Sequence, residues 1–153
     1  MLYLQFLADG ARYLLPTSCV IEVTPLVPLK KLPKAPACVS GLMNYRGRSL
    51  PVIDASQLLA GHPATSYLSS RIVVVKVALP GQAERDIGLL LEKATEVLKM
   101  EEERFTEAGI ENPQTPYLGE VAMDSRGGML QRIFPHRLLS ETDARQLFSA
   151  AEN

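Results

Sequence analysis

The residues best able to carry chemistry in this sequence are two cysteines and two histidines, and none of them stands in a recognisable catalytic pattern. Cys19 and Cys38 have small apolar neighbours, which favours buried structural thiols over an activated thiolate. His62 lies in a Gly-His-Pro loop and His136 follows a proline, so surface or capping roles are expected for both. A thiol nucleophile at Cys19 or Cys38 remains the enzymatic alternative.

Signals for metals and cofactors are also missing. The sequence has no Cys-x-x-Cys or His-x-x-x-His spacing of the kind that binds zinc. Gly127 and Gly128 lack the surrounding pattern of a phosphate-binding loop and read as a hairpin turn. We therefore expect no catalytic residue, no cofactor and no metal. A ligand-sensing barrel that binds a small molecule between two lobes is a second alternative.

Composition places the chain among ordinary globular proteins. Its 153 residues are 46% hydrophobic and 22% charged, with a formal net charge of -1, which suits one domain or two small packed lobes. A pI near 6.1 argues against a nucleic-acid partner held by bulk charge. No apolar run approaches the roughly 20 residues of a membrane-spanning helix, and the N-terminus lacks signal-peptide features. We expect a cytoplasmic protein with reduced cysteines and no direct membrane insertion.

The charge is unevenly distributed along the chain. Residues 1–60 contain six basic and three acidic residues, a net charge of +3, whereas residues 81–125 contain four basic and eleven acidic residues, a net charge of -7. The acidic run Glu101-Glu102-Glu103 is most simply a solvated surface. An acidic face that helps to select a partner is the other interpretation.

Glycine and proline divide the first half into short strands. The Asp9-Gly10 pair predicts a hairpin turn, and a helical turn near residues 19–23 leads into a strand. Four prolines keep residues 25–36 extended. A helical turn at residues 56–59 is expected to be capped by Asp54 or Ser56 and to stop at Gly61. The strands expected in this half span residues 2–7, 12–15, 42–46 and 50–54.

The second half shows the same pattern of short strands separated by turns. It follows a polar loop at residues 62–70, which is the expected boundary between two lobes. Residues 101–109 are a helix candidate, residues 135–139 a short helix, and Ser140 begins a C-terminal helix. The expected strands span residues 71–79, 86–92, 94–100, 117–123 and 129–134. Short strands with close turns indicate an all-β fold of two small barrels.

The segment Cys19–Asp54 contains residues with a distinctive spacing, namely Val20, Glu22, Pro36, Gly41, Asn44, Arg46, Gly47, Pro51 and Asp54. This spacing resembles that of the CheW-like domain family, whose members are adaptors of bacterial chemosensory arrays. Further resemblance lies at residues 71–75, 87–92, 95–98 and 117–119, so the similarity covers residues 2–139.

The resemblance implies a mainly β fold of two intertwined, five-stranded SH3-like barrels around a shared core, with a few short helices. On this basis residues 1–153 form a single domain. Residues 16–65 would make the first barrel, residues 66–139 with the N-terminal strand the second, and residues 140–153 the C-terminal helix.

The resemblance also implies a non-enzymatic adaptor at membrane-bound receptor arrays. Its partners would be the cytoplasmic tips of methyl-accepting chemotaxis receptors and the regulatory domain of a CheA-type histidine kinase. Arg46 would bind a receptor carboxylate through two parallel hydrogen bonds. Val20 and Val97 would form the apolar floor of a groove that binds a helical hairpin. Glu22 would pair with Arg46 or with a basic residue of the partner. The positions expected to bind partners are Val20, Glu22, Gly41, Asn44, Arg46 and Val97.

Three departures from the family pattern favour an accessory pathway, such as Wsp-like surface sensing or biofilm control. Tyr45 and Ala55 stand where the family has leucine, which predicts thinner local packing, and the last strand at residues 130–135 is less apolar than usual.

Overall fold

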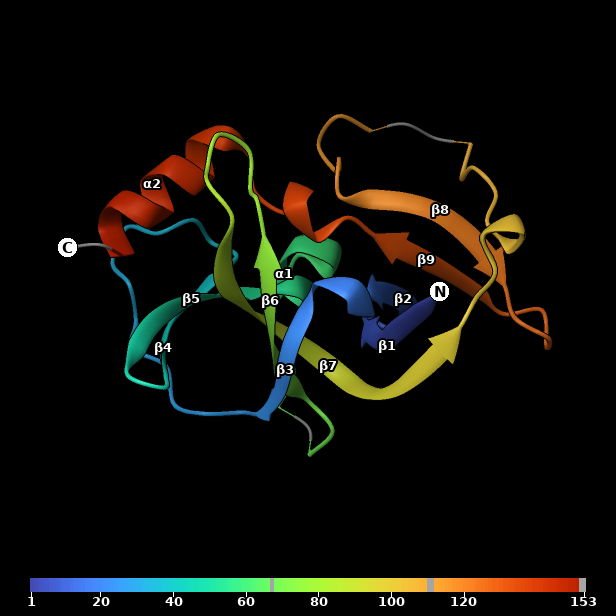
Figure 1. Ribbon diagram of the computed structural model, residues 1–153, viewed down its shortest axis with the longest axis horizontal. Helices are drawn as coiled ribbons and strands as arrows, with labels where there is room; N and C mark the ends of the chain where they lie inside the picture. The colour runs from blue at the N-terminus through green and yellow to red at the C-terminus, as the bar shows by residue number, and fades with distance from the viewer. Residues whose placement is uncertain (67, 110–111, 152–153) are drawn as a thin grey trace.

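The computed structural model describes residues 1–66, 68–109 and 112–151, and most of their regular structure is β (Figure 1). In chain order the strands are β1 Leu2–Ala8, β2 Ala11–Pro16, β3 Val20–Pro25, β4 Val39–Tyr45, β5 Arg48–Asp54, β6 Arg71–Val77, β7 Arg85–Lys99, β8 Leu118–Met123 and β9 Met129–Ile133. The α-helices are α1 Ala55–Ala60 and α2 Glu141–Ala151, and the short 3-10 turns are η1 Thr17–Cys19, η2 Glu102–Arg104 and η3 Pro135–Arg137.

The strands form two five-stranded barrels that share β7. Barrel I follows the order β3-β6-β7-β5-β4, with β5 parallel to β7 and the other neighbours antiparallel. Barrel II follows the order β7-β1-β2-β9-β8, with β2 parallel to β9. Figure 1 shows β8 and β9 at the opposite end of the molecule from α2 and β4. The expected all-β fold of two barrels with a C-terminal helix is therefore confirmed.

Strand β7 differs from the expectation of two separate strands at residues 86–92 and 94–100. Its first half pairs with β6 and β5, and its second half pairs with β1. The change of partner occurs near Lys93, which has a left-handed φ of 50°, and the β1 register shifts between Gln5 and Leu7. This bulge bends one strand from the first barrel into the second instead of ending it.

The lobe boundary consequently lies elsewhere than the expected division into residues 16–65 and 66–139. Strand β6 and the first half of β7 complete the barrel of β3, β4 and β5. The two sheets therefore meet inside β7 and not in the loop at residues 62–70, because one continuous strand serves both barrels.

Two buried carboxylates fix the segment that follows α1. Asp54 caps α1 by accepting hydrogen bonds from the backbone N–H groups of Ser56 and Gln57, and its other oxygen accepts from Ala64 at 2.8 Å. Glu92 accepts from the N–H of Thr65 at 2.7 Å. Helix α1 then ends at Gly61, which has a φ of 77° and forms the expected C-terminal stop.

The remaining helical expectations are met in part. Residues 101–109 contain only η2, so the helix expected there is wrong. The backbone of Thr106 instead exchanges two hydrogen bonds of 2.8 and 2.9 Å with Val121 on β8, which ends the helical turn. Helix α2 begins as expected after Ser140, whose hydroxyl accepts the N–H of Asp143 at 3.1 Å. Residues 152–153 of the expected helix lie outside the described residues.

Candidate partner-binding site

The β4–β5 turn presents Arg46 on a rigid backbone. Arg46 and Gly47 are its two central residues, with φ values of 52° and 84°, as in the type I′ turns that fit the twist of a hairpin. Asn44 stabilises the turn, because its side-chain oxygen accepts the N–H of Gly47 at 2.9 Å. Arg46 thus adopts a left-handed backbone conformation that is less favourable for arginine than for asparagine or glycine.

Glu22 on β3 lies across from this turn and joins the two elements. The Tyr45 hydroxyl donates to Glu22 Oε2 at 2.6 Å, and Arg46 Nη2 lies 3.3 Å from Glu22 Oε1. The hydrogen bond from Tyr45, together with the charge of Arg46, lowers the pKa of Glu22, and the same hydrogen bond raises the pKa of Tyr45. Of the two expected alternatives for Glu22, the structure contains the pair with Arg46.

Tyr45 was expected only as a departure from the family leucine, and the structure makes it a member of this site. Its side chain is buried among Met43, Leu50 and Val52, so the substitution of the family leucine does not thin the packing at this position. The guanidinium of Arg46 lies 5.3 Å from the centre of the Tyr45 ring, within the range of a cation–π contact. A phenol at this position, one residue before the arginine, was the available signal.

Arg46 itself remains open to a partner. Its side chain is 73% exposed, and the single pair with Glu22 leaves other guanidinium N–H groups for an incoming carboxylate. The site can therefore bind an acidic group while Tyr45 and Glu22 hold the arginine in place.

Gly41 has a backbone role beside this site. A Cβ at this position would lie 2.4 Å from the carbonyl oxygen of Lys30. Lys30 and Leu42 exchange two backbone hydrogen bonds of 2.9 and 2.7 Å, which return the proline-rich segment to β4. Only glycine lets the two backbones approach this closely.

The two valines of the expected groove lie in different barrels. Val20 begins β3, pairs with Val75 and packs partly buried against the main core. Val97 lies on the second half of β7, pairs with Leu4 and is 57% exposed. The structure therefore brings Glu22, Asn44 and Arg46 together, with Val20 and Gly41 on the same two strands. A groove floored by both valines would have to span the two barrels.

Strand β3 also exposes two apolar side chains that the sequence interpretation missed. Ile21 and Val23 are 43% and 45% exposed, on a strand whose second edge has no partner strand within the described residues. Glu22 and Thr24 alternate with them and are less exposed. This inverted alternation, with polar residues turned inward, was the sequence signal for an apolar outer face.

The two cysteines considered as nucleophiles lie in surroundings that disfavour the thiolate form. Cys19 and Cys38 are free, and burial raises the pKa of both thiols to about 11, which disfavours a thiolate nucleophile. Within the described ranges no three His, Cys, Asp or Glu side chains are grouped to hold a metal ion. Among these residues no helix has the length and apolarity to cross a membrane.

Comparison with known proteins gives consistent matches. The sequence profile of the CheW-like domain family matches residues 2–143. The chain is 28% identical over 128 residues to a probable chemotaxis protein CheW of Rhizobium etli, covering 82% of this chain and 78% of that protein. It is 33% identical over 79 residues to a chemotaxis protein CheW of Rhizobium meliloti, covering 52% of this chain and 48% of that protein.

A solved structure shows the same fold. The scaffolding protein TtCheW of Thermoanaerobacter tengcongensis superposes with a TM-score of 0.78 at 24% identity, covering 93% of this chain and 89% of that chain.

Proposed function

The chain belongs to the CheW-like domain family, and from this membership we propose that it is a non-enzymatic adaptor that couples methyl-accepting chemoreceptors to a CheA-type histidine kinase. The adaptor would act in the cytoplasm, at membrane-bound receptor arrays. The names of the two Rhizobium relatives place them in chemotaxis.

The observation that carries this proposal is the exposed Arg46 held by Tyr45 and Glu22. A single guanidinium on a rigid turn gives a planar donor that can bind a carboxylate on a helix in two parallel hydrogen bonds. Glu22 fixes the arginine at 3.3 Å without burying it. We assign receptor or kinase contact to this turn.

Of the other expected partner-binding positions, three support the same surface and Val97 lies apart from it. Asn44 holds the turn and Gly41 allows the close backbone approach beside it. Val20 lies on the strand of Glu22. Val97 would form a second contact on barrel II, where an exposed valine offers an apolar anchor.

A binding experiment with a matched control tests the proposal. Purified protein is mixed with receptor cytoplasmic fragments and with the kinase regulatory domain, as wild type, Arg46→Ala and Arg145→Ala. Arg145 is the matched control for Arg46, because its side chain is also mostly exposed (68%) and also lies 3.3 Å from one carboxylate, that of Glu141. We expect wild type and Arg145→Ala to bind both partners and Arg46→Ala to lose at least one. Binding of neither partner by wild type would reject the adaptor function.

We propose further that the pathway is an accessory one, such as surface sensing or biofilm control. The support is the departure from the family pattern at Tyr45, whose hydroxyl adds a contact to Glu22 that leucine cannot make. The receptor fragment of a surface-sensing system is expected to bind more tightly than that of a flagellar system in the same assay. The reverse order would contradict this assignment.

A further inference from the structure

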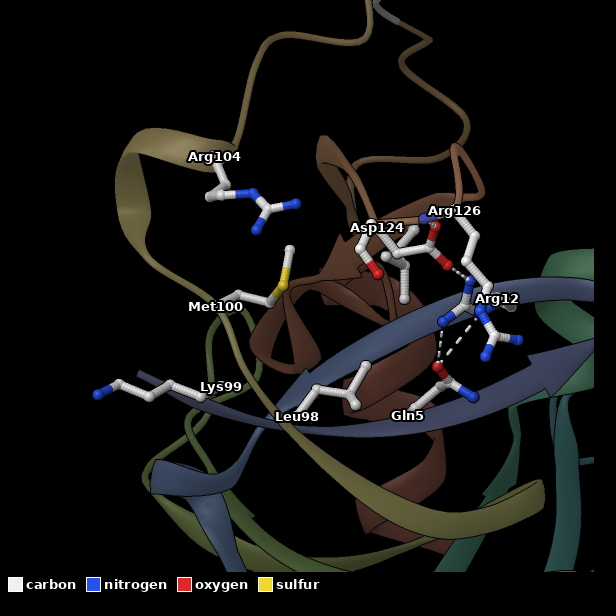
Figure 2. Close-up of a pocket in the computed structure, with 10 residues that line it drawn as sticks. Gln5, Arg12, Leu98, Lys99, Met100, Arg104, Asp124 and Arg126 are labelled. Carbon is white, nitrogen blue, oxygen red and sulfur yellow. Dashed lines mark hydrogen bonds and ion pairs between the residues drawn. The ribbon is translucent and has the colours of Figure 1, made fainter.

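A cleft of about 560 Å³ opens on barrel II, far along the chain from the β4–β5 turn, and none of the matches assigns it a ligand. It lies between the end of β7 and the β8–β9 turn. Figure 2 shows Arg104 on one side, Arg12 and Arg126 on the other, and Leu98 and Met100 between them. The residues come from three stretches that are distant in sequence: the β1–β2 hairpin, residues 98–104 and residues 124–130.

The walls of the cleft carry an excess of positive charge. Four cationic side chains, Arg12, Lys99, Arg104 and Arg126, line it against the single carboxylate of Asp124. Glu101 is a further acid near the rim, 3.9 Å from Lys99 Nζ. This local excess is opposite in sign to the net charge of -7 that residues 81–125 carry as a segment.

Internal contacts engage the cations to different degrees. Arg104 donates one hydrogen bond to the carbonyl of Met123 and keeps its other N–H groups for a ligand, and within the described residues Lys99 has only the distant Glu101. Arg12 donates to Gln5 Oε1 at 3.1 and 2.8 Å and pairs with Asp124. Asp124 also accepts the N–H groups of Arg126 and Gly128, each at 2.8 Å, and these contacts lower its pKa to about 2. Asp124 is therefore charged, and its charge offsets that of Arg12 alone among the four cations.

The guanidinium of Arg126 has no partner within the described ranges, and Lys99, Arg104 and Arg126 are all exposed. The floor between these cations is apolar. Leu130 and Met100 are 1% and 7% exposed, and Leu98 is half-buried above them. A ligand for this cleft needs an apolar group for the floor and anionic groups on both sides of it.

We propose that this cleft binds a short acidic peptide segment of a protein partner, in which an apolar side chain lies between carboxylates. The apolar side chain would cover Leu98, and the carboxylates would pair with Arg104 and Lys99 on one side and with Arg126 on the other. An extended polyanion such as a nucleic acid is a poorer fit, because it would run past the acidic segment Glu101-Glu102-Glu103. This proposal is independent of what binds the β4–β5 turn.

The test uses the full chain and a defined probe. The probe is a fluorescein-labelled peptide with one Leu flanked on each side by Asp and with Gly and Ser at its ends, followed by fluorescence anisotropy. Two control peptides carry Asn for Asp, or Gly for Leu. We expect the first peptide to bind and the Asn peptide not to bind. Amide chemical shifts should move at residues 98–104 and 124–128.

Two triple variants separate this cleft from general attraction between charges. The rim variant Lys99→Gln/Arg104→Gln/Arg126→Gln should weaken binding about tenfold, since three partly exposed ion pairs are lost. The matched variant Lys30→Gln/Lys31→Gln/Lys34→Gln removes the same charge from exposed lysines around barrel I and should leave binding within about twofold. All six side chains are exposed, so both variants should fold.

Three results would overturn the proposal. These are no binding of the Asp–Leu peptide, equal weakening by the two triple variants, or equal affinity for the Leu and Gly peptides. Inorganic polyphosphate that displaces the probe at a lower concentration than the unlabelled peptide would indicate a simple anion site and would also reject a peptide ligand.

Discussion

The two barrels have the same number of strands, but they differ in the side chains that fill their interiors. One apolar cluster of barrel I includes Met43, Tyr45, Val52 and Ile72. The arginines of its ion pairs, Arg46 and Arg48, lie exposed outside this cluster. Barrel II has a smaller apolar cluster that includes Tyr3, Leu14 and Leu130. A largely buried arginine, Arg132, lies beside this cluster.

Arg132 shows how barrel II uses charge where barrel I uses apolar packing. Its side chain is only 13% exposed, donates to the Tyr3 hydroxyl at 3.2 Å and binds both Glu102 and Glu120. Its guanidinium also lies 4.2 Å from the centre of the Phe105 ring. Barrel II therefore keeps charged groups, those of Arg132, Glu102 and Glu120, beside its apolar cluster. Barrel I, by contrast, is expected to contribute more to stability.

The largest expected difference between the barrels comes from matched leucine truncations. Leu89 is fully buried in the main core beside barrel I, and Leu130 is 1% exposed beneath the cleft of barrel II. Leu89→Ala should lower the free energy of unfolding by about 4 kcal/mol and Leu130→Ala by about 2 kcal/mol, because water from the cleft can fill the second cavity. Urea unfolding curves measure both. An equal or larger loss for Leu130→Ala would contradict the comparison.

The next expected effect is a loss of stability at acid pH that arises from Asp124 in barrel II. The pKa of Asp124 is lowered from 3.8 to about 2, chiefly by the hydrogen bond from Arg12. A lowered folded-state pKa stabilises the fold above pH 3.8, and this contribution is lost as the pH falls toward 2. In Arg12→Gln the pKa of Asp124 should rise toward 3.8, as measured by carbon NMR of its carboxyl group. An unchanged pKa would mean that the backbone N–H groups alone stabilise the carboxylate.

The smallest effect is expected at the surface pair of barrel I. Arg46→Ala should change the free energy of unfolding by less than about 0.5 kcal/mol, because Arg46 is 73% exposed and solvent weakens its attraction to Glu22. Urea unfolding of this variant at low and at physiological salt gives the value. A loss above about 1 kcal/mol would indicate that the turn stabilises the barrel and would weaken its assignment as a binding element.

The turns of this fold could be predicted from sequence because their causes are local. Asp9-Gly10 does form the β1–β2 turn, with φ values of 52° and 80°, and Asp54 and Gly61 do bound α1. In each case one or two residues supply the required backbone conformation or the hydrogen bonds to free N–H groups.

The continuity of β7 could not be predicted in this way. The bend at Lys93 has no glycine to mark it, although its φ of 50° is one that glycine adopts more easily. What holds the bend is remote: the N–H of Ala94 donates to the carbonyl of Ser69 at 3.1 Å. Contacts between distant segments decide that residues 85–99 form one strand.

The candidate sites also differ in whether their residues are close together or far apart in sequence. Asn44, Arg46 and Gly47 are close in sequence, so their turn was visible in the motif. The role of Tyr45 depends on Glu22, 23 residues away, and was not visible. The cleft of barrel II joins Arg12 to Asp124 over 112 residues, and the negative charge of the surrounding segment masked its cations.

The sharing of β7 also has a consequence for synthesis on the ribosome. The β1–β2 hairpin leaves the exit tunnel early, yet the backbone of Met1 bonds to Met100, and β1 pairs with residues 92–99. This first hairpin must therefore wait with both edges unpaired, because β1 needs β7 and β2 needs β9. Long-range pairings of this kind form slowly, so the nascent protein is expected to be most exposed to aggregation and to chaperones before β7 and β9 emerge.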